Sequence, residues 1–214
     1  MMTVMSRSSR WPGILLAFAL ITAAVVFWIT VLPMLDGRAW PRFVPGLDIV
    51  LVHAWSGVFV LIAGAAALYV GWTRRQFRWH KWIGYTYLGS GSINAGAALL
   101  ASVLSYREPK SLYIATASIA IFWFVFAAMA WRAAWNRRFD THREWVIRSY
   151  VLTWTFVGCR LAAKVDFYPW LGIEGVTAAI WVNWIVPVLL CEVALQWNRG
   201  SRLTPVATAS RRHS

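Results

Sequence analysis

Two histidines, His80 and His142, stand in similar basic surroundings, each at the start of a long apolar stretch. The first lies in RRQFRWHKW and the second in RRFDTHREW. Two imidazoles at one depth of a membrane could ligate the iron of a b-type haem, while nearby cations neutralise its propionates. The alternative is that each imidazole caps its helix or lies amphipathically among lipid headgroups. Both interpretations stay open at the level of sequence.

The charges around these histidines restrict what they could bind. Only Asp140 and Glu144 are acidic in the two segments. The cations repel a bare Zn²⁺, and a structural zinc site would bring cysteines or more carboxylates. An anionic guest fits better, namely haem propionates, a quinone radical anion or anionic lipid headgroups. The basic side chains concerned are Arg74, Arg75, Arg78, Lys81, Arg137, Arg138 and Arg143.

A third histidine, His53, follows Asp48 by five residues and is predicted on the opposite side of the membrane. A second haem would need a second ligand at that depth, and the remaining histidine, His213, lies in the C-terminal tail. A role for His53 alone remains, such as a hydrogen bond to a quinone or a proton relay. A bond from its ring to a neighbouring carbonyl is the competing explanation.

Two arginines lie inside apolar stretches and need partners. Arg148 is predicted to form a structural ion pair with Glu192. Arg160 lies deeper, where Asn183 or Asp166 could serve. Either arginine could contact a cofactor, or both could hold helices together.

The composition assigns these residues to membrane helices. The chain has 214 residues, of which 59% are hydrophobic and 14% charged, whereas soluble domains carry about 25% charged residues. The net charge of +13 is spread in short clusters between apolar runs. This distribution indicates a multi-pass membrane protein and no nucleic-acid partner.

Six membrane spans are predicted, because about 20 apolar residues cross the hydrocarbon layer. Backbone groups in lipid must bond within the chain, so the predicted fold is an all-α, six-helix membrane bundle. Residues 1–198 form this domain, and residues 199–214 form a disordered cytoplasmic tail. The spans cover residues 12–34, 49–73, 82–105, 111–133, 145–165 and 175–197.

The positive charges predict the orientation. Most of the 21 Lys and Arg residues fall on the side that holds both termini, which places the N- and C-termini in the cytoplasm of a bacterial inner membrane. The expected partners are anionic lipid headgroups on that side, together with a redox partner or a second copy of the chain.

The two histidine segments resemble each other. Each has an arginine pair, then a histidine, a cation, a tryptophan, an isoleucine and a tyrosine. The similarity predicts two parallel helical-hairpin repeats, formed by spans two–three and four–five. Chance similarity is the alternative.

Three sequence elements resemble a family of bacterial multi-pass membrane proteins of unknown function. They are HAWSG (53–57), HKWIGYTYL (80–88) and HREWVIRSYVLTWTFVGCRL (142–161). They are similar to the family's H-x-x-x-G, H-[RK]-W-x-G-x-x-Y and H-x-x-W-x-x-R-S-Y elements. The resemblance implies the membrane architecture and supplies no chemistry. The site residues that it implies are His53, His80, His142, Arg148 and Arg160.

Three kinds of function are compatible with these residues. The first is a redox-type subunit that holds b-type haem or quinone near the cytoplasmic face. The second is a non-catalytic structural or assembly subunit, and the third is a small transporter lined by Arg160, Asn183 and His53. The sequence contains no nucleophile–base set, phosphate loop or paired carboxylates, so it does not indicate hydrolysis or phosphoryl transfer.

Overall fold

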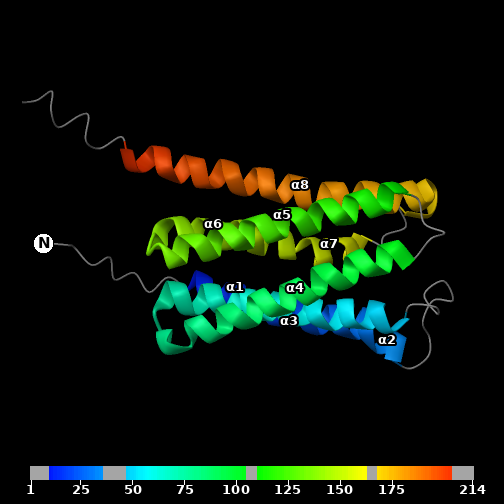
Figure 1. Ribbon diagram of the computed structural model, residues 1–214, viewed down its shortest axis with the longest axis horizontal. Coiled ribbons are helices and arrows are strands. Elements are labelled where there is room, and N and C mark those ends of the chain that lie inside the picture. The colour runs from blue at the N-terminus through cyan, green and yellow to red at the C-terminus, as the bar shows by residue number, and fades with distance from the viewer. Residues whose placement is uncertain (1–9, 36–46, 105–109, 163–167, 204–214) are drawn as a thin grey trace, which may run out of the picture. The chain divides into compact units, whose positions relative to one another are not determined.

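The computed structural model describes residues 10–35, 47–104, 110–162 and 168–203, and the regular structure in these ranges is helical. The chain divides into two units, Met1–Thr116 and Ala117–Ser214. Long helices make up most of both units (Figure 1).

The first unit is built on two long antiparallel helices, α3 (Leu47–Thr73) and α4 (His80–Leu104), which lie side by side (Figure 1). A short 3₁₀ turn at Phe77–Trp79 precedes α4. Helix α1 (Trp11–Val26) packs along α3, and its chain continues through a π-helical turn into α2 (Leu32–Leu35). Small buried residues such as Ala54, Ala65, Gly91 and Ala95 face these contacts, and their size allows close helix approach.

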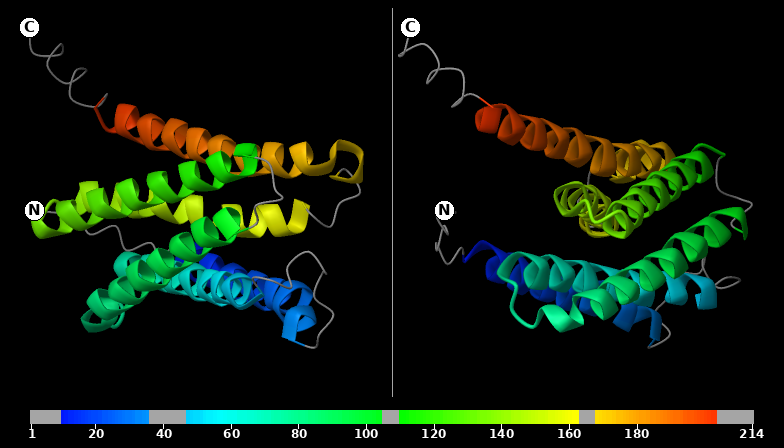
Figure 2. Two further views of the ribbon diagram at one scale, coloured as in Figure 1. Left: turned by 45° about the vertical axis from the view of Figure 1, so that its right-hand side comes forward. Right: turned by 60° about the vertical axis from the view of Figure 1, so that its left-hand side comes forward.

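The second unit contains most of α5 (Lys110–Trp135), followed by α6 (Phe139–Thr153), α7 (Thr155–Ala162) and α8 (Tyr168–Leu203). Helices α6 and α7 run one after the other, and both pack on α8 (Figure 2). Aromatic contacts join α5 to its neighbours. Phe126 lies 5.5 Å from Trp145 of α6, and Phe122 lies 5.1 Å from Trp184 of α8, measured between ring centroids.

Among the described residues, five helical segments are long and apolar enough to cross a membrane. They correspond to all the predicted spans except the fifth, and they are Trp11–Val31, Asp48–Thr73, Phe77–Leu104, Lys110–Trp135 and Glu174–Trp197. Many large apolar side chains on them are exposed, including Trp28, Leu190 and Val193. Such exposure suits contact with lipid chains rather than water.

The predicted fifth span, 145–165, is not one continuous helix. It falls on α6 and α7, which are separated at Trp154, where the Trp154 N–H donates to the carbonyl of Val151. The hydroxyls of Ser149 and Thr153 donate back to carbonyls of their own helix, a pattern that bends helices. Polar residues therefore interrupt this segment.

Helix α8 extends further than the sequence predicted. The predicted boundary between the membrane domain and the tail lies at residue 198, whereas α8 ends at Leu203. The helix therefore carries Arg199, which the sequence assigned to the tail, to a position beside α6. Residues 204–214 of the predicted tail lie outside the described residues.

The contact between α7 and α8 generates a test of packing. A Cβ atom on Gly158 would collide with the side chain of Asn183. We expect Gly158→Ala to lower the free energy of unfolding by about 1–3 kcal/mol, because overpacking displaces the neighbouring helix. Thermal unfolding in detergent measures this change.

Gly96→Ala is the matched control, because a Cβ atom added to Gly96 would meet no neighbouring atom within 4 Å. The double variant Gly158→Ala/Asn183→Ala should recover part of the loss. Equal midpoints for Gly158→Ala and Gly96→Ala would show that this contact does not limit stability.

Candidate functional site

His142 lies in the first turn of α6 and contacts the preceding helix. Its Nδ1 lies 2.9 Å from the backbone oxygen of Ala130 on α5. A carbonyl oxygen can only accept, so Nδ1 carries the proton in this hydrogen bond. In a neutral imidazole, Nε2 then holds the lone pair. This arrangement, a backbone carbonyl fixing the tautomer and the ring, is common behind metal-ligating histidines.

His80 begins α4 and is packed against the end of α3. Its ring stacks on Phe77, with centroids 5.1 Å apart and an interplanar angle of 10°. On another side, a Cβ atom added to Gly71 would lie 3.1 Å from the His80 Cε1 atom. Glycine at position 71 therefore makes room for the imidazole, and the ring is held in one orientation.

The two hairpins that contain these histidines share a local plan. Arg74 follows α3 with φ of 58°, and Arg137 follows α5 with φ of 57°. A left-handed residue commonly ends a helix, although glycine is the usual choice. In both hairpins a histidine near the start of the second helix contacts the first helix: His80 of α4 contacts α3, and His142 of α6 contacts α5. His80 belongs to the first unit and His142 to the second.

His53 joins α3 to α4 through a reciprocal pair of hydrogen bonds. Its Nδ1 donates to the backbone oxygen of Asn94 at 3.1 Å, and the Asn94 Nδ2 donates to the backbone oxygen of His53 at 2.6 Å. The same amide nitrogen lies 3.3 Å from Ser56 Oγ. The structure therefore contains the hydrogen bond from the His53 ring to a backbone carbonyl, which the sequence analysis gave as the competing explanation.

A shallow, open and largely apolar groove lies on the same helix pair. Its volume is about 550 Å³, within the range of small-molecule sites. Ser56 lines the groove and also touches Asn94, so the groove wall adjoins the His53 contact. The other lining residues are Leu51, Val52, Trp55, Phe59, Thr86, Gly89, Ser90 and Ile93.

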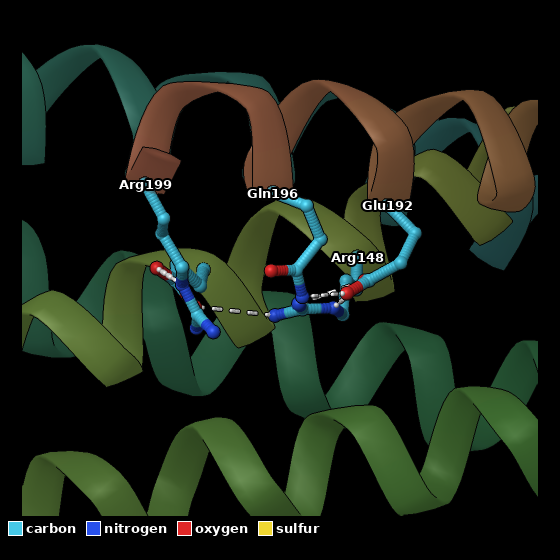
Figure 3. Close-up of polar contacts among 5 residues, drawn as sticks. Arg148, Glu192, Gln196 and Arg199 are labelled. Atoms are coloured by element: carbon cyan, nitrogen blue, oxygen red, sulfur yellow. Dashed lines mark hydrogen bonds and ion pairs between the residues drawn. The ribbon is translucent and has the colours of Figure 1, made fainter. Parts of the chain in front are cut away.

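Arg148 is the centre of a charged network between α6 and α8 (Figure 3). Its Nη2 and Nε lie 2.8 and 2.9 Å from Glu192 Oε2, so Arg148 contacts the counter-charge that the sequence assigned to it. The Arg148 Nη1 also lies 3.6 Å from Glu144. Arg199 donates to Glu144, and Gln196 donates to Glu192 at 2.9 Å. The Arg148 side chain is only 10% exposed, so these carboxylates compensate a buried charge.

Sequence reasoning missed three members of this network, namely Glu144, Gln196 and Arg199. The four-residue spacings of Glu144 from Arg148, and of Glu192 from Gln196, could have indicated both contacts. Arg199 carried no such signal, because its partner Glu144 lies 55 residues away in sequence.

Arg160 and Asn183 lie on α7 and α8. The Arg160 guanidinium lies 5.7 Å from the centre of the Phe156 ring. The Asn183 amide donates to the backbone oxygen of Ala179, and the backbone oxygen of Asn183 accepts from Thr155. Asn183 thus contributes to the packing of α7 on α8. Asp166, the other expected partner of Arg160, lies outside the described residues.

Among the described residues, no three His, Cys, Asp or Glu side chains gather as a metal site.

Comparison with protein families shows a match over residues 50–195 to the family described as "Predicted membrane protein (DUF2306)". The match covers more than half of the chain and includes His53, His80, His142, Arg148, Arg160 and Glu192, whereas Gln196 and Arg199 lie beyond its end. Neither the curated proteins nor the solved structures compared with the chain gave a match.

The Arg148 network predicts a large cost for removing its central charge. We expect Arg148→Met to lower the free energy of unfolding by about 1.5–3 kcal/mol, because hydrogen bonds to charged groups are lost and Glu192 loses its cation. Arg199→Ala, at a half-exposed position, should cost less. Chemical or thermal unfolding in detergent measures both. The double variant Arg148→Met/Glu192→Gln should be more stable than Arg148→Met alone, and a result in the opposite direction would refute the pairing.

Glu144 lies outside the predicted spans, and its ion pairs predict that the stability of the folded protein depends on pH. Its hydrogen bond with Arg199, followed by the charges of Arg199 and Arg148, holds the pKa of this carboxyl below its ordinary value of 4.5 despite partial burial. A lowered pKa stabilises the folded protein above the ordinary pKa, and this contribution is lost as the pH falls through the folded pKa. Wild type should therefore exceed Glu144→Gln in unfolding midpoint near neutral pH, and the difference should shrink below pH 4.5. A constant difference over that range would contradict the ion pair.

Proposed function

The chain belongs to this family of predicted membrane proteins, and we propose that it acts as a redox-type subunit. In this proposal it holds a b-type haem or a quinone near the cytoplasmic face of a bacterial inner membrane. The distribution of Lys and Arg supports the orientation, with both termini in the cytoplasm. Electrons would pass to or from a partner protein or a membrane quinone.

The hydrogen bond from His142 to Ala130 is the observation that carries the proposal. It keeps the proton on Nδ1, at 2.9 Å from the carbonyl oxygen, so that Nε2 is the basic nitrogen. Haem iron in helical proteins is commonly held by a histidine nitrogen of this kind. The fixed ring also lowers the entropy lost on ligation.

His80 is the second proposed ligand, and its support is the packing of its ring. Contact with Gly71 and stacking on Phe77 hold the imidazole in one orientation. The exposed Arg74 and Arg78 lie in the turn before it, where guanidinium groups could neutralise haem propionates. A bound haem would supply one-electron chemistry, and the histidines would position it.

The other predicted site residues take supporting roles in this proposal. Arg148 lies on the same helix as His142, so its ion pair with Glu192 positions α6. His53 adjoins the groove on α3 and α4 through Asn94 and Ser56. A quinone in that groove is the second form of the proposal, with His53 as a hydrogen-bonding neighbour. Arg160 is assigned to α7 packing.

A structural or assembly subunit is the second candidate function. The observation that favours it is that Arg148, Glu144, Glu192 and Asn183 all take part in contacts within or between helices. Such contacts stabilise a bundle without any cofactor. A transporter has less support, because His53 and Asn183 hydrogen-bond to backbone carbonyls instead of lining a described channel.

Absorption spectroscopy tests the haem form of the proposal. The detergent-purified protein, expressed with added haem, should show a Soret band that shifts on reduction. His80→Ala and His142→Ala should each abolish the band or convert it to a five-coordinate spectrum. His142→Gly should recover the six-coordinate spectrum when imidazole is added, which separates loss of a ligand from loss of folding.

His213→Ala, outside the described residues, is the matched control and should retain the band. Absence of a Soret band in wild type overturns the haem form. A band that survives both His80→Ala and His142→Ala overturns the ligand assignment. Extraction and chromatography of co-purified lipid then tests for quinone, and absence of quinone as well as haem would favour the structural subunit.

A further inference from the structure

We propose that the basic connector, residues 74–81, binds the phosphate headgroups of anionic phospholipids. It comprises the turn after α3 and the first two residues of α4. Its cations Arg74, Arg75, Arg78 and Lys81 are all exposed. Arg74 and Arg78 are also the cations proposed to neutralise haem propionates, but lipid binding by the basic connector requires no bound haem or quinone.

The position of the basic connector supports a membrane ligand. Helix α3 ends at Thr73, and the next membrane-length segment begins at Phe77. A turn between two such segments lies at the level of the headgroups, where the phosphates of the bilayer are concentrated. We therefore assign the anion to the lipid rather than to free phosphate.

Aromatic rings alternate with the cations of the basic connector. The Arg74 guanidinium lies 4.9 Å from the centre of the Phe77 ring, and that of Arg78 lies 5.6 Å from the Trp79 ring. Phe77 and Trp79 are themselves 46% and 48% exposed. Half-exposed aromatic rings anchor a segment at the membrane interface, and cation–π contact holds the guanidinium groups beside them.

Charge distinguishes this turn from its counterpart in the second unit. The sequence has no Asp or Glu from residue 49 to residue 107, so the hairpin itself does not neutralise the basic connector. The turn between α5 and α6 is followed by Asp140 and Glu144, and Glu144 contacts Arg148 and Arg199. The cations of the first hairpin are therefore the better site for an external anion.

Lipid retention by the full chain tests the proposal. The protein is reconstituted with equal amounts of phosphatidylglycerol and phosphatidylcholine of identical chains, extracted in mild detergent, and its bound lipid is quantified. Wild type should retain phosphatidylglycerol preferentially. The triple variant Arg74→Gln/Arg75→Gln/Arg78→Gln should lose this preference. At low salt, the affinity for phosphatidylglycerol relative to phosphatidylcholine should fall about fivefold for each cation removed.

Two variants control for folding and net charge. The triple Arg→Lys variant at positions 74, 75 and 78 should keep the preference, because it keeps the charge. A second triple variant, Arg137→Gln/Arg138→Gln/Arg143→Gln, removes the same amount of charge from the second hairpin. It should keep most of the preference for phosphatidylglycerol. All variants must show the wild-type orientation by protease accessibility.

Three results would overturn the proposal. They are equal retention of both lipids by wild type, equal losses in the two glutamine variants, and displacement of phosphatidylglycerol by millimolar glycerol phosphate. The last result would indicate a site for a soluble phosphate. The haem measurement is separate, so either proposal can fail while the other stands.

Discussion

Hydrocarbon offers no hydrogen-bond partner, and this constraint accounts for most of the polar contacts in the two units. Hydroxyl groups such as those of Ser56 and Thr153 donate to carbonyls of their own helices. His53 and Asn94 donate to each other's backbone across two helices. The buried charge of Arg148 lies beside two carboxylates. These polar groups within the apolar helices therefore also connect or bend helices.

Helix α6 shows how this constraint can prepare a site. At its start, His142 is bound to the carbonyl of Ala130, and six residues later Arg148 is bound to Glu192 of α8. These contacts fix both the rotation of the helix and the tautomer of the imidazole. The same polar content divides the segment into α6 and α7 at Trp154.

The two histidine hairpins have similar backbones and different charges. Both contain an arginine with positive φ after the first helix, and both return a histidine to that helix. In the first hairpin the cations are exposed beside aromatic rings, whereas in the second Glu144 lies between Arg148 and Arg199. The two hairpins therefore share a local backbone plan and differ in how their charged side chains are paired.

The sequence by itself determined the class of the protein, because apolar runs bounded by charges have one stable environment. It also indicated the partner of Arg148, since Glu192 is an acidic residue in the neighbouring apolar run. Only the tertiary structure decided the break at Trp154, the extension of α8 to Leu203 and the contact of Arg199 with Glu144. These features depend on how side chains far apart in sequence pack against one another, and hydrophobicity and charge spacing along the chain do not specify that packing.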